Sequence, residues 1–191
     1  MKLPFNHRIR NDLKESLIDW KVIIAFIPIA FGTYMFHEFG HWTLGELTGN
    51  DMTAGLNYAT PRNGNFLHGP DALWSAIGGP LFTILQGLIF LLVTWLTKSI
   101  YAYSAAFFAV FSRFFSIFFG DFHLQDESGI ASLLGVYKYS IAALVLIILS
   151  LILWRCCRIM KLNVKAVAYF AVLGVLAILM VLAVNNFILR K

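Results

Sequence analysis

The most informative property of this 191-residue sequence is how little charge it carries, because charged residues make up 13% of the chain and hydrophobic residues 59%. Soluble globular domains contain about 25% charged residues, so the composition excludes an ordinary soluble domain. The basic residues cluster at the ends of apolar segments. Such clusters are typical of topology signals and of contacts with anionic lipid head groups, not of a nucleic-acid-binding surface.

Other features are scarce as well. The only two cysteines, Cys156 and Cys157, are adjacent, which excludes a disulfide framework. No small-x-small cleavage site follows the first apolar run, so we expect this run to remain in the membrane as an anchor. Five histidines are too few for a desaturase-like di-iron site. The sequence contains no internal repeat and no sign of a second domain.

Long apolar runs are what the chain has in abundance. Five segments are long enough to cross a bilayer, at about 22–44, 74–97, 101–119, 139–154 and 166–189. They predict an all-α, polytopic membrane bundle of about five transmembrane helices. We divide the chain into a basic interfacial N-terminal segment, 1–21, and a single integral membrane domain, 22–191. Segment 1–21 is expected to be either a short helix on the membrane surface or a solvated tail.

The first apolar run leads into a His-Glu-Phe-Gly-His motif at residues 37–41. On a helix, His37 and His41 lie on one face about 6 Å apart, which suits two imidazoles that bind one zinc ion. Glu38 is placed where a carboxylate can take a proton from a metal-bound water. His37 lies about 22 Å from the entry side of a core about 30 Å thick. We therefore expect the motif in the exit half of the membrane, where water can reach it.

A catalytic zinc usually has three protein ligands, and the only further cluster of candidate ligands lies at 121–127. Five spans place this cluster, the motif and the start of the second span on one face of the membrane. Arg113 lies inside the third span, and an ionisable residue at that depth is a functional hypothesis. We expect its side chain to snorkel or to reach Asp121. Either Arg113 or His123 is a candidate donor to an oxyanion.

Gly78-Gly79-Pro80 interrupts the second span about one turn from its start. The freed backbone groups require cover from protein or from a cavity, and glycines allow another backbone to approach closely. We predict that Gly78, Gly79 and Pro80 bind substrate, the alternative being a helix-packing notch.

The polar connection 45–73 contains a period-two pattern over 52–59, and Asn63-Gly64 is a favoured dipeptide for a tight hairpin turn. These signals predict a small β-hairpin beside the motif helix. Its exposed edge could hold an extended peptide by strand addition. The alternative is an ordinary loop.

The motif, Gly45, Gly49 and Gly78-Gly79-Pro80 together resemble the site-2 protease family of intramembrane zinc metalloproteases. The resemblance covers about residues 22–154. It implies a zinc ion held by His37 and His41, with Glu38 as the general base. It also implies hydrolysis of a peptide bond in or next to a transmembrane segment of a membrane protein substrate.

Three features depart from the family pattern. The segment 125–131 replaces the family's Leu-Asp-Gly and resembles the Asp segment of small, divergent members, which favours Asp126 over Asp121 as the third ligand. Thr83 stands where the family has asparagine, and Gln86 is a candidate substitute. Ten of the fifteen basic residues lie on the N-terminal side of the membrane, which directs the site outwards, whereas family sites usually lie nearer the cytoplasm.

The sequence thus predicts an intramembrane zinc metalloendopeptidase in a bacterial cell membrane, with the lipid bilayer and a transmembrane substrate as partners and no nucleic acid. The alternative is a zinc-binding but proteolytically inactive adaptor that holds a transmembrane partner. A motif packed without metal would bury an ionisable cluster at high cost. Glu38→Gln separates an enzyme from an adaptor, because only the enzyme should lose its function.

Overall fold

The computed structural model describes residues 11–189, and five of its helices in this range are long and apolar enough to cross a membrane. They are α2 (Trp20–Leu47), α3 (Gly69–Thr97), α4 (Ile100–Phe119), α6 (Ser140–Met160) and α7 (Val164–Val184), which the turn of π-helix η2 (Asn185–Leu189) extends. The short 3-10 helix η1 (Phe122–Leu124) and α5 (Asp126–Leu134) lie between α4 and α6. The described chain is a multi-pass membrane bundle, which confirms the predicted fold class.

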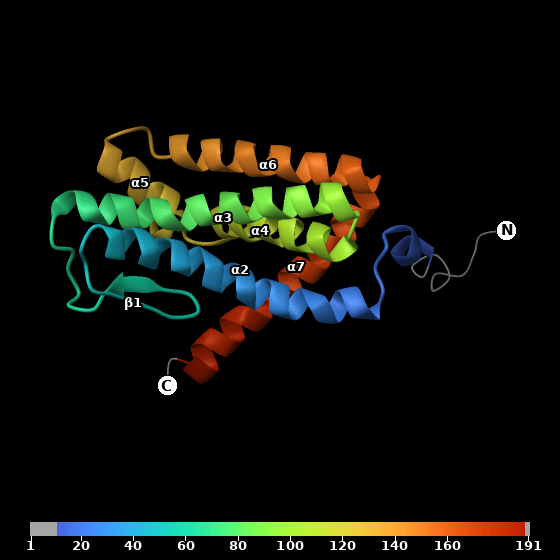
Figure 1. The fold of residues 1–191 in the computed structure, drawn as a ribbon, viewed down its shortest axis with the longest axis horizontal. Coiled ribbons are helices and arrows are strands. Elements are labelled where there is room, and N and C mark those ends of the chain that lie inside the picture. Colours follow the sequence, from blue (N-terminus) through green and yellow to red (C-terminus); the bar gives the residue numbers. More distant parts are fainter. Residues whose placement is uncertain (1–10, 190–191) are drawn as a thin grey trace.

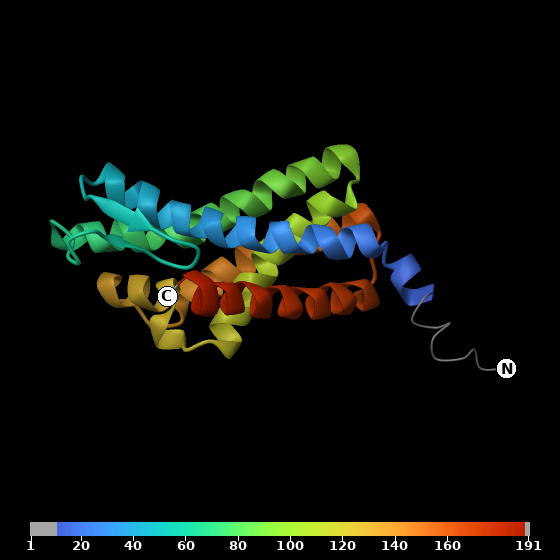
Figure 2. The same ribbon diagram turned by 90° about the horizontal axis from the view of Figure 1, so that it is seen from below.

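The helix α4 is the centre of the bundle and packs against α2, α3, α6 and α7 (Figures 1 and 2). Small and aromatic side chains are interspersed along it, so that neighbouring helices approach closely while the rings fill the space between them. Phe107 and Phe108 are fully buried there and pack with Phe26 of α2 and Phe170 of α7. This aromatic cluster holds the helix that also carries Arg113.

Defined caps set the helix boundaries. The Asp19 carboxylate accepts a hydrogen bond from Val22 N at 2.9 Å and begins α2. Pro70 lies in the first turn of α3, and Lys98 and Lys161 adopt left-handed conformations that end α3 and α6. The second span therefore begins five residues earlier, and the fourth ends six residues later, than the apolar runs predict, because polar residues join both helices.

The fourth span does not begin at Ser128, as a continuous apolar helix would allow. Gly135 adopts a left-handed conformation with φ of +66° and ends α5, and α6 begins at Ser140. This break lets α5 turn back onto α3 and α6 at the end of the bundle that also carries the hairpin (Figure 1). Asp126 is thereby brought next to His37 and His41.

A two-stranded antiparallel sheet follows α2, as predicted. Strand β1 (Met52–Ala54) pairs with β2 (Ala59–Pro61), and Thr53 lies opposite Thr60. The connection spans 55–58, where Gly55 N donates to Tyr58 O at 2.8 Å. The prediction that Asn63-Gly64 forms the hairpin turn is wrong, because these residues form a separate turn after β2, with Gly64 at φ of +78°.

The N-terminal segment is described only from residue 11, so its first ten residues lie outside the structure's description. Residues 11–15 are helical and dock on α7, where Asp12 contacts Lys165 Nζ at 3.4 Å and Tyr169 Oη at 3.3 Å. Ile18 is buried in the core. The described part of the segment is thus packed against the bundle.

Candidate metal centre

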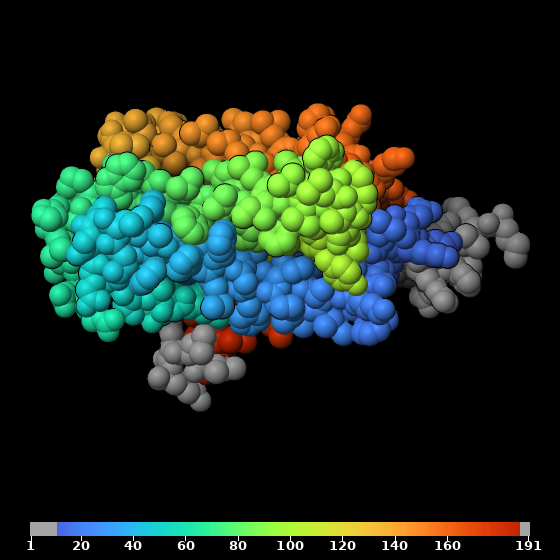
Figure 3. Space-filling view, in the orientation of Figure 1, coloured from blue at the N-terminus to red at the C-terminus, as the bar shows by residue number. Residues whose placement is uncertain are grey.

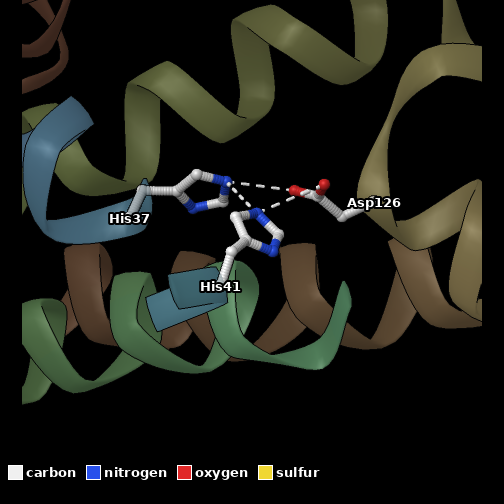
Figure 4. A group of neighbouring side chains, drawn as sticks. All are labelled: His37, His41 and Asp126. Atoms are coloured by element: carbon white, nitrogen blue, oxygen red, sulfur yellow. Dashed lines mark hydrogen bonds and ion pairs between the residues drawn. The ribbon is translucent and has the colours of Figure 1, made fainter. Parts of the chain in front are cut away.

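The helix α2 places the two motif histidines on its buried stripe. Val22, Phe26, Ala30 and Thr33 precede His37 and His41 on this stripe, at the three- and four-residue spacing of one helix face. The two side chains are each 11% exposed, and their Nε2 atoms lie 3.2 Å apart. Both rings therefore direct one nitrogen toward the same point (Figure 4).

Asp126, at the first turn of α5, faces the two imidazoles across the bundle (Figure 4). Its Oδ2 lies 3.0 Å from His37 Nε2 and its Oδ1 lies 3.4 Å from His41 Nε2. One ligand atom from each of the three residues lies within 4.8 Å of the others. The three side chains therefore form a group that could hold one metal ion.

Asp121, the competing candidate for third ligand, is placed differently. Its side chain is exposed, and its Oδ1 accepts a hydrogen bond from His123 N at 3.0 Å as the cap of η1. His123, a candidate oxyanion donor, is also exposed and does not line the cavity next to the histidines. The described structure thus brings Asp126, and not Asp121, to the motif.

Hydrogen bonds from the far side of each imidazole fix which nitrogen faces the centre. His41 Nδ1 donates to the carbonyl oxygen of Ser75 at 2.7 Å. His37 Nδ1 lies 2.9 Å from Thr83 Oγ1, and the threonine proton is used in a 3.1 Å bond to Gly79 O. The Thr83 hydroxyl oxygen must therefore accept a hydrogen bond from His37, which places a proton on His37 Nδ1. In the neutral imidazoles both Nε2 atoms consequently carry lone pairs, the tautomer that metal ligation requires. When a ring is protonated, the same Nε2 atom donates to Asp126 instead.

The glycines of α3 allow this helix to approach the motif closely. A Cβ atom at Gly78 would lie 2.5 Å from the carbonyl carbon of Gly40, so the backbones of α2 and α3 are in contact there. A Cβ atom at Gly79 would collide with both imidazoles. Gly78, Gly79 and Pro80 are buried and do not line the adjacent cavity. Their position fits the helix-packing alternative, and their contact with substrate stays a prediction.

Arg113 of α4 also contacts the group formed by His37, His41 and Asp126. The prediction that its side chain snorkels or reaches Asp121 is wrong, because Arg113 is 7% exposed and its guanidinium contacts Glu127 through Nε and Nη2. Nη2 also lies 3.1 Å from Asp126 Oδ2. Burial opposes ionisation of Asp126, but the contacts with His37 and His41 and the Arg113 charge outweigh it. They hold the pKa of the Asp126 carboxyl well below its usual range. The carboxylate is therefore ionised at neutral pH, as a cation ligand must be.

Glu38 and the metal group share one cavity of about 630 Å³. Glu38 is 7% exposed and lines this cavity together with His37, His41 and Asp126. Ser112 and Ser116 of α4 add polar groups to its wall. A buried carboxylate beside three ligand groups in a partly polar cavity is an arrangement that can move a proton.

The hairpin and α7 form further walls of this cavity. Residues 57–59, at the turn and the start of β2, line it on one side, and Ile178 and Leu182 of α7 line it on another. Figure 3 shows the hairpin segment beside the motif end of α2 on the molecular surface. The cavity thus lies between apolar membrane helices and a short strand.

The sequence indicates the three candidate ligands but not the residues that form hydrogen bonds with the imidazoles. Ser75, Gly79 and Thr83 recur every four residues on one face of α3, a spacing that signals a shared role. The Gln86 side chain donates through Nε2 to Thr33 Oγ1 at 2.7 Å, and its substitution for the family's asparagine stays a prediction. No protein-family model, curated protein or solved structure matches this chain.

Proposed function

We propose that this protein is an intramembrane zinc metalloprotease that hydrolyses a peptide bond in or next to a transmembrane segment of a membrane protein in a bacterial cell membrane. The observation that carries the proposal is the convergence of His37, His41 and Asp126 on one point beside Glu38, in a cavity between membrane-spanning helices. Two histidines and a carboxylate are a ligand set of catalytic zinc sites.

The separations of the ligand atoms fit zinc. Ligands about 2.05 Å from a tetrahedral zinc ion are about 3.3 Å apart. The two Nε2 atoms are 3.2 Å apart here, His37 Nε2 lies 3.0 Å from Asp126 Oδ2, and His41 Nε2 lies 3.4 Å from Asp126 Oδ1. The two histidines thus approach different oxygens of one carboxylate at separations close to this value. Both imidazoles are also hydrogen-bonded on their outer sides through Nδ1, as ligands of protein-bound zinc usually are. Three protein ligands leave the fourth position of such an ion for water or substrate.

Zinc held by these three residues would lower the pKa of a bound water to about 7 and polarise the substrate carbonyl. Glu38 then acts as the proton carrier: its carboxylate accepts a proton from the attacking water and passes it to the leaving amine. The surrounding apolar helices limit the entry of bulk water, which strengthens each charge interaction in the cavity. The edge at residues 57–59 lines the same cavity and could hold the substrate backbone in an extended form.

The test compares cells that produce the wild-type protein, Glu38→Gln or the control Glu15→Gln, whose side chain is exposed near the N-terminus. Mass spectrometry of newly formed protein termini surveys all membrane proteins at once, so no candidate substrate has to be chosen. The proposal expects termini in or next to membrane spans with the wild type and the control but not with Glu38→Gln. All three purified proteins should hold equal zinc.

Two other results would contradict the proposal in different ways. Zinc in all three proteins without any terminus that depends on Glu38 would favour the adaptor, which holds a transmembrane partner without cutting it. A wild-type protein that binds no zinc would remove the metal site and the enzyme together.

A further inference from the structure

Arg113 and Glu127 form a buried ion pair next to the metal group. Glu127 is fully buried and Arg113 is 7% exposed. Arg113 Nε donates to Glu127 Oε1 at 3.2 Å, and Nη2 donates to Oε2, so both carboxylate oxygens are engaged. Burying two charges is expensive, and such a pair is weak evidence for a purely stabilising role. Its position therefore requires another explanation.

The same guanidinium contacts two of the three metal-binding side chains. Nη2 lies 3.1 Å from Asp126 Oδ2, and Nη1 lies 3.3 Å from His37 Nε2. Asp126 and Glu127 are consecutive residues at the start of α5. One planar side chain of α4 thus binds both carboxylates of this turn, with a rigid fork of donors that the single ammonium group of a lysine lacks.

The need for such a contact follows from how α5 is supported. Helix α5 has nine residues and packs against α3 and α6, whereas the histidines belong to α2. Asp126 must therefore be held against a helix on which its own helix does not pack. A carboxylate on a short, separate helix can rotate or withdraw unless a second group fixes it. Among the described contacts of Asp126, Arg113 supplies the only charge of opposite sign outside the imidazoles.

We propose that Arg113, clamped by Glu127, is the positioning device that holds Asp126 in its metal-binding position. Arg113 contacts Oδ2 of the Asp126 carboxylate and leaves Oδ1, which faces His41 Nε2, for the ion. Glu127 fixes the guanidinium and balances its charge, so that the arginine does not simply repel the cation. This inference rests on the metal site of the proposed function and is independent of proteolysis.

The experiment measures the zinc Kd of purified protein in detergent by competition with a chromophoric chelator. The variants are Glu127→Gln, Arg113→Lys and the double variant Arg113→Met with Glu127→Leu. Residues that orient metal ligands are commonly worth 10–100-fold in metal affinity, and all three variants should lose affinity in that range. The double variant removes both charges at once and should retain its fold, because replacing a buried ion pair by apolar residues is often neutral or stabilising.

The matched control is the exposed pair Arg62–Asp51, with Nε 3.1 Å from Oδ2 and side chains 65% and 61% exposed. Asp51→Asn should leave the zinc Kd unchanged. Wild-type affinity in the folded double variant would overturn the inference, as would Glu127→Gln with a lower unfolding temperature but an unchanged Kd. A wild-type protein without zinc would instead overturn the metal site itself, so the two failures are distinguishable.

Discussion

A methyl group added at Gly79 should disrupt metal binding, because this position faces both imidazoles. A Cβ atom there would lie 2.5 Å from His37 Cε1 and 2.6 Å from His41 Cε1, and it would also meet His41 Nε2. The rings cannot move independently of α3, since their Nδ1 atoms bind Ser75 O and Thr83 Oγ1 at 2.7 and 2.9 Å. Gly79→Ala therefore tests whether the two imidazoles lie against the backbone of α3 at this position.

The size of the effect follows from these distances. Ordinary contact with a Cβ atom begins at 3.4 Å, so the His37 ring must move by about 0.9 Å. Metal–ligand distances tolerate deviations of about 0.2 Å. Loss of one orienting hydrogen bond commonly costs 10–100-fold in affinity, and both rings are affected here. We expect zinc affinity to fall at least about 100-fold, which corresponds to about 2.8 kcal/mol.

The assay is the same chelator competition, with circular dichroism to verify that the helices are intact. The control is Gly32→Ala in α2, where an added Cβ meets nothing within 4 Å. That variant should bind zinc normally and gain about 0.5–1 kcal/mol of helix stability. Normal zinc affinity in Gly79→Ala would refute the reasoning, because the two imidazoles would then not occupy the observed positions.

Two further substitutions examine the hydrogen bonds behind the imidazoles. Thr83→Val removes the oxygen that accepts from His37 Nδ1 and should weaken zinc binding 10–100-fold. Thr83→Ser keeps a hydroxyl and should retain most of the affinity. Equal zinc Kd values for the two variants would contradict the hydrogen bond between His37 Nδ1 and Thr83 Oγ1. Ser75→Ala should change the zinc Kd by less than about threefold, well below the cost of losing an orienting hydrogen bond. The reason is that His41 Nδ1 binds the backbone carbonyl of Ser75, which the substitution keeps, whereas the serine hydroxyl donates to His41 O. A large loss in Ser75→Ala, measured by the same competition, would mean that the hydroxyl orients the ring.

The sequence predicts the helices and the histidine pair well because both depend on local spacing. A run of about 20 apolar residues spans a bilayer wherever it occurs, and an i, i+4 pair faces one side of any helix. The prediction that His37 and His41 share one helix face therefore requires no information on tertiary structure. The preference for Asp126 over Asp121 rests on a family resemblance, since sequence distance alone does not distinguish the two aspartates.

Features that depend on tertiary structure were not predictable in the same way. The break at Gly135 turns α5 back toward the histidines, and one glycine does not specify the direction of a turn. The partner of Arg113 depends on that turn, so Asp121 was expected where Glu127 is found. The hairpin turn lies at 55–58 because pairing of the strands, and not the most favourable dipeptide, fixed the register.

The most direct test of the central claim is the zinc content of detergent-purified protein by elemental analysis. Wild type, His37→Ala, Asp126→Ala and Asp121→Ala should be measured in parallel. The geometry predicts about one zinc ion per chain in wild type and Asp121→Ala, as in a single three-ligand site, with loss of zinc in His37→Ala and Asp126→Ala. Zinc that is retained in Asp126→Ala but lost in Asp121→Ala, or a wild-type protein without zinc, would contradict the account.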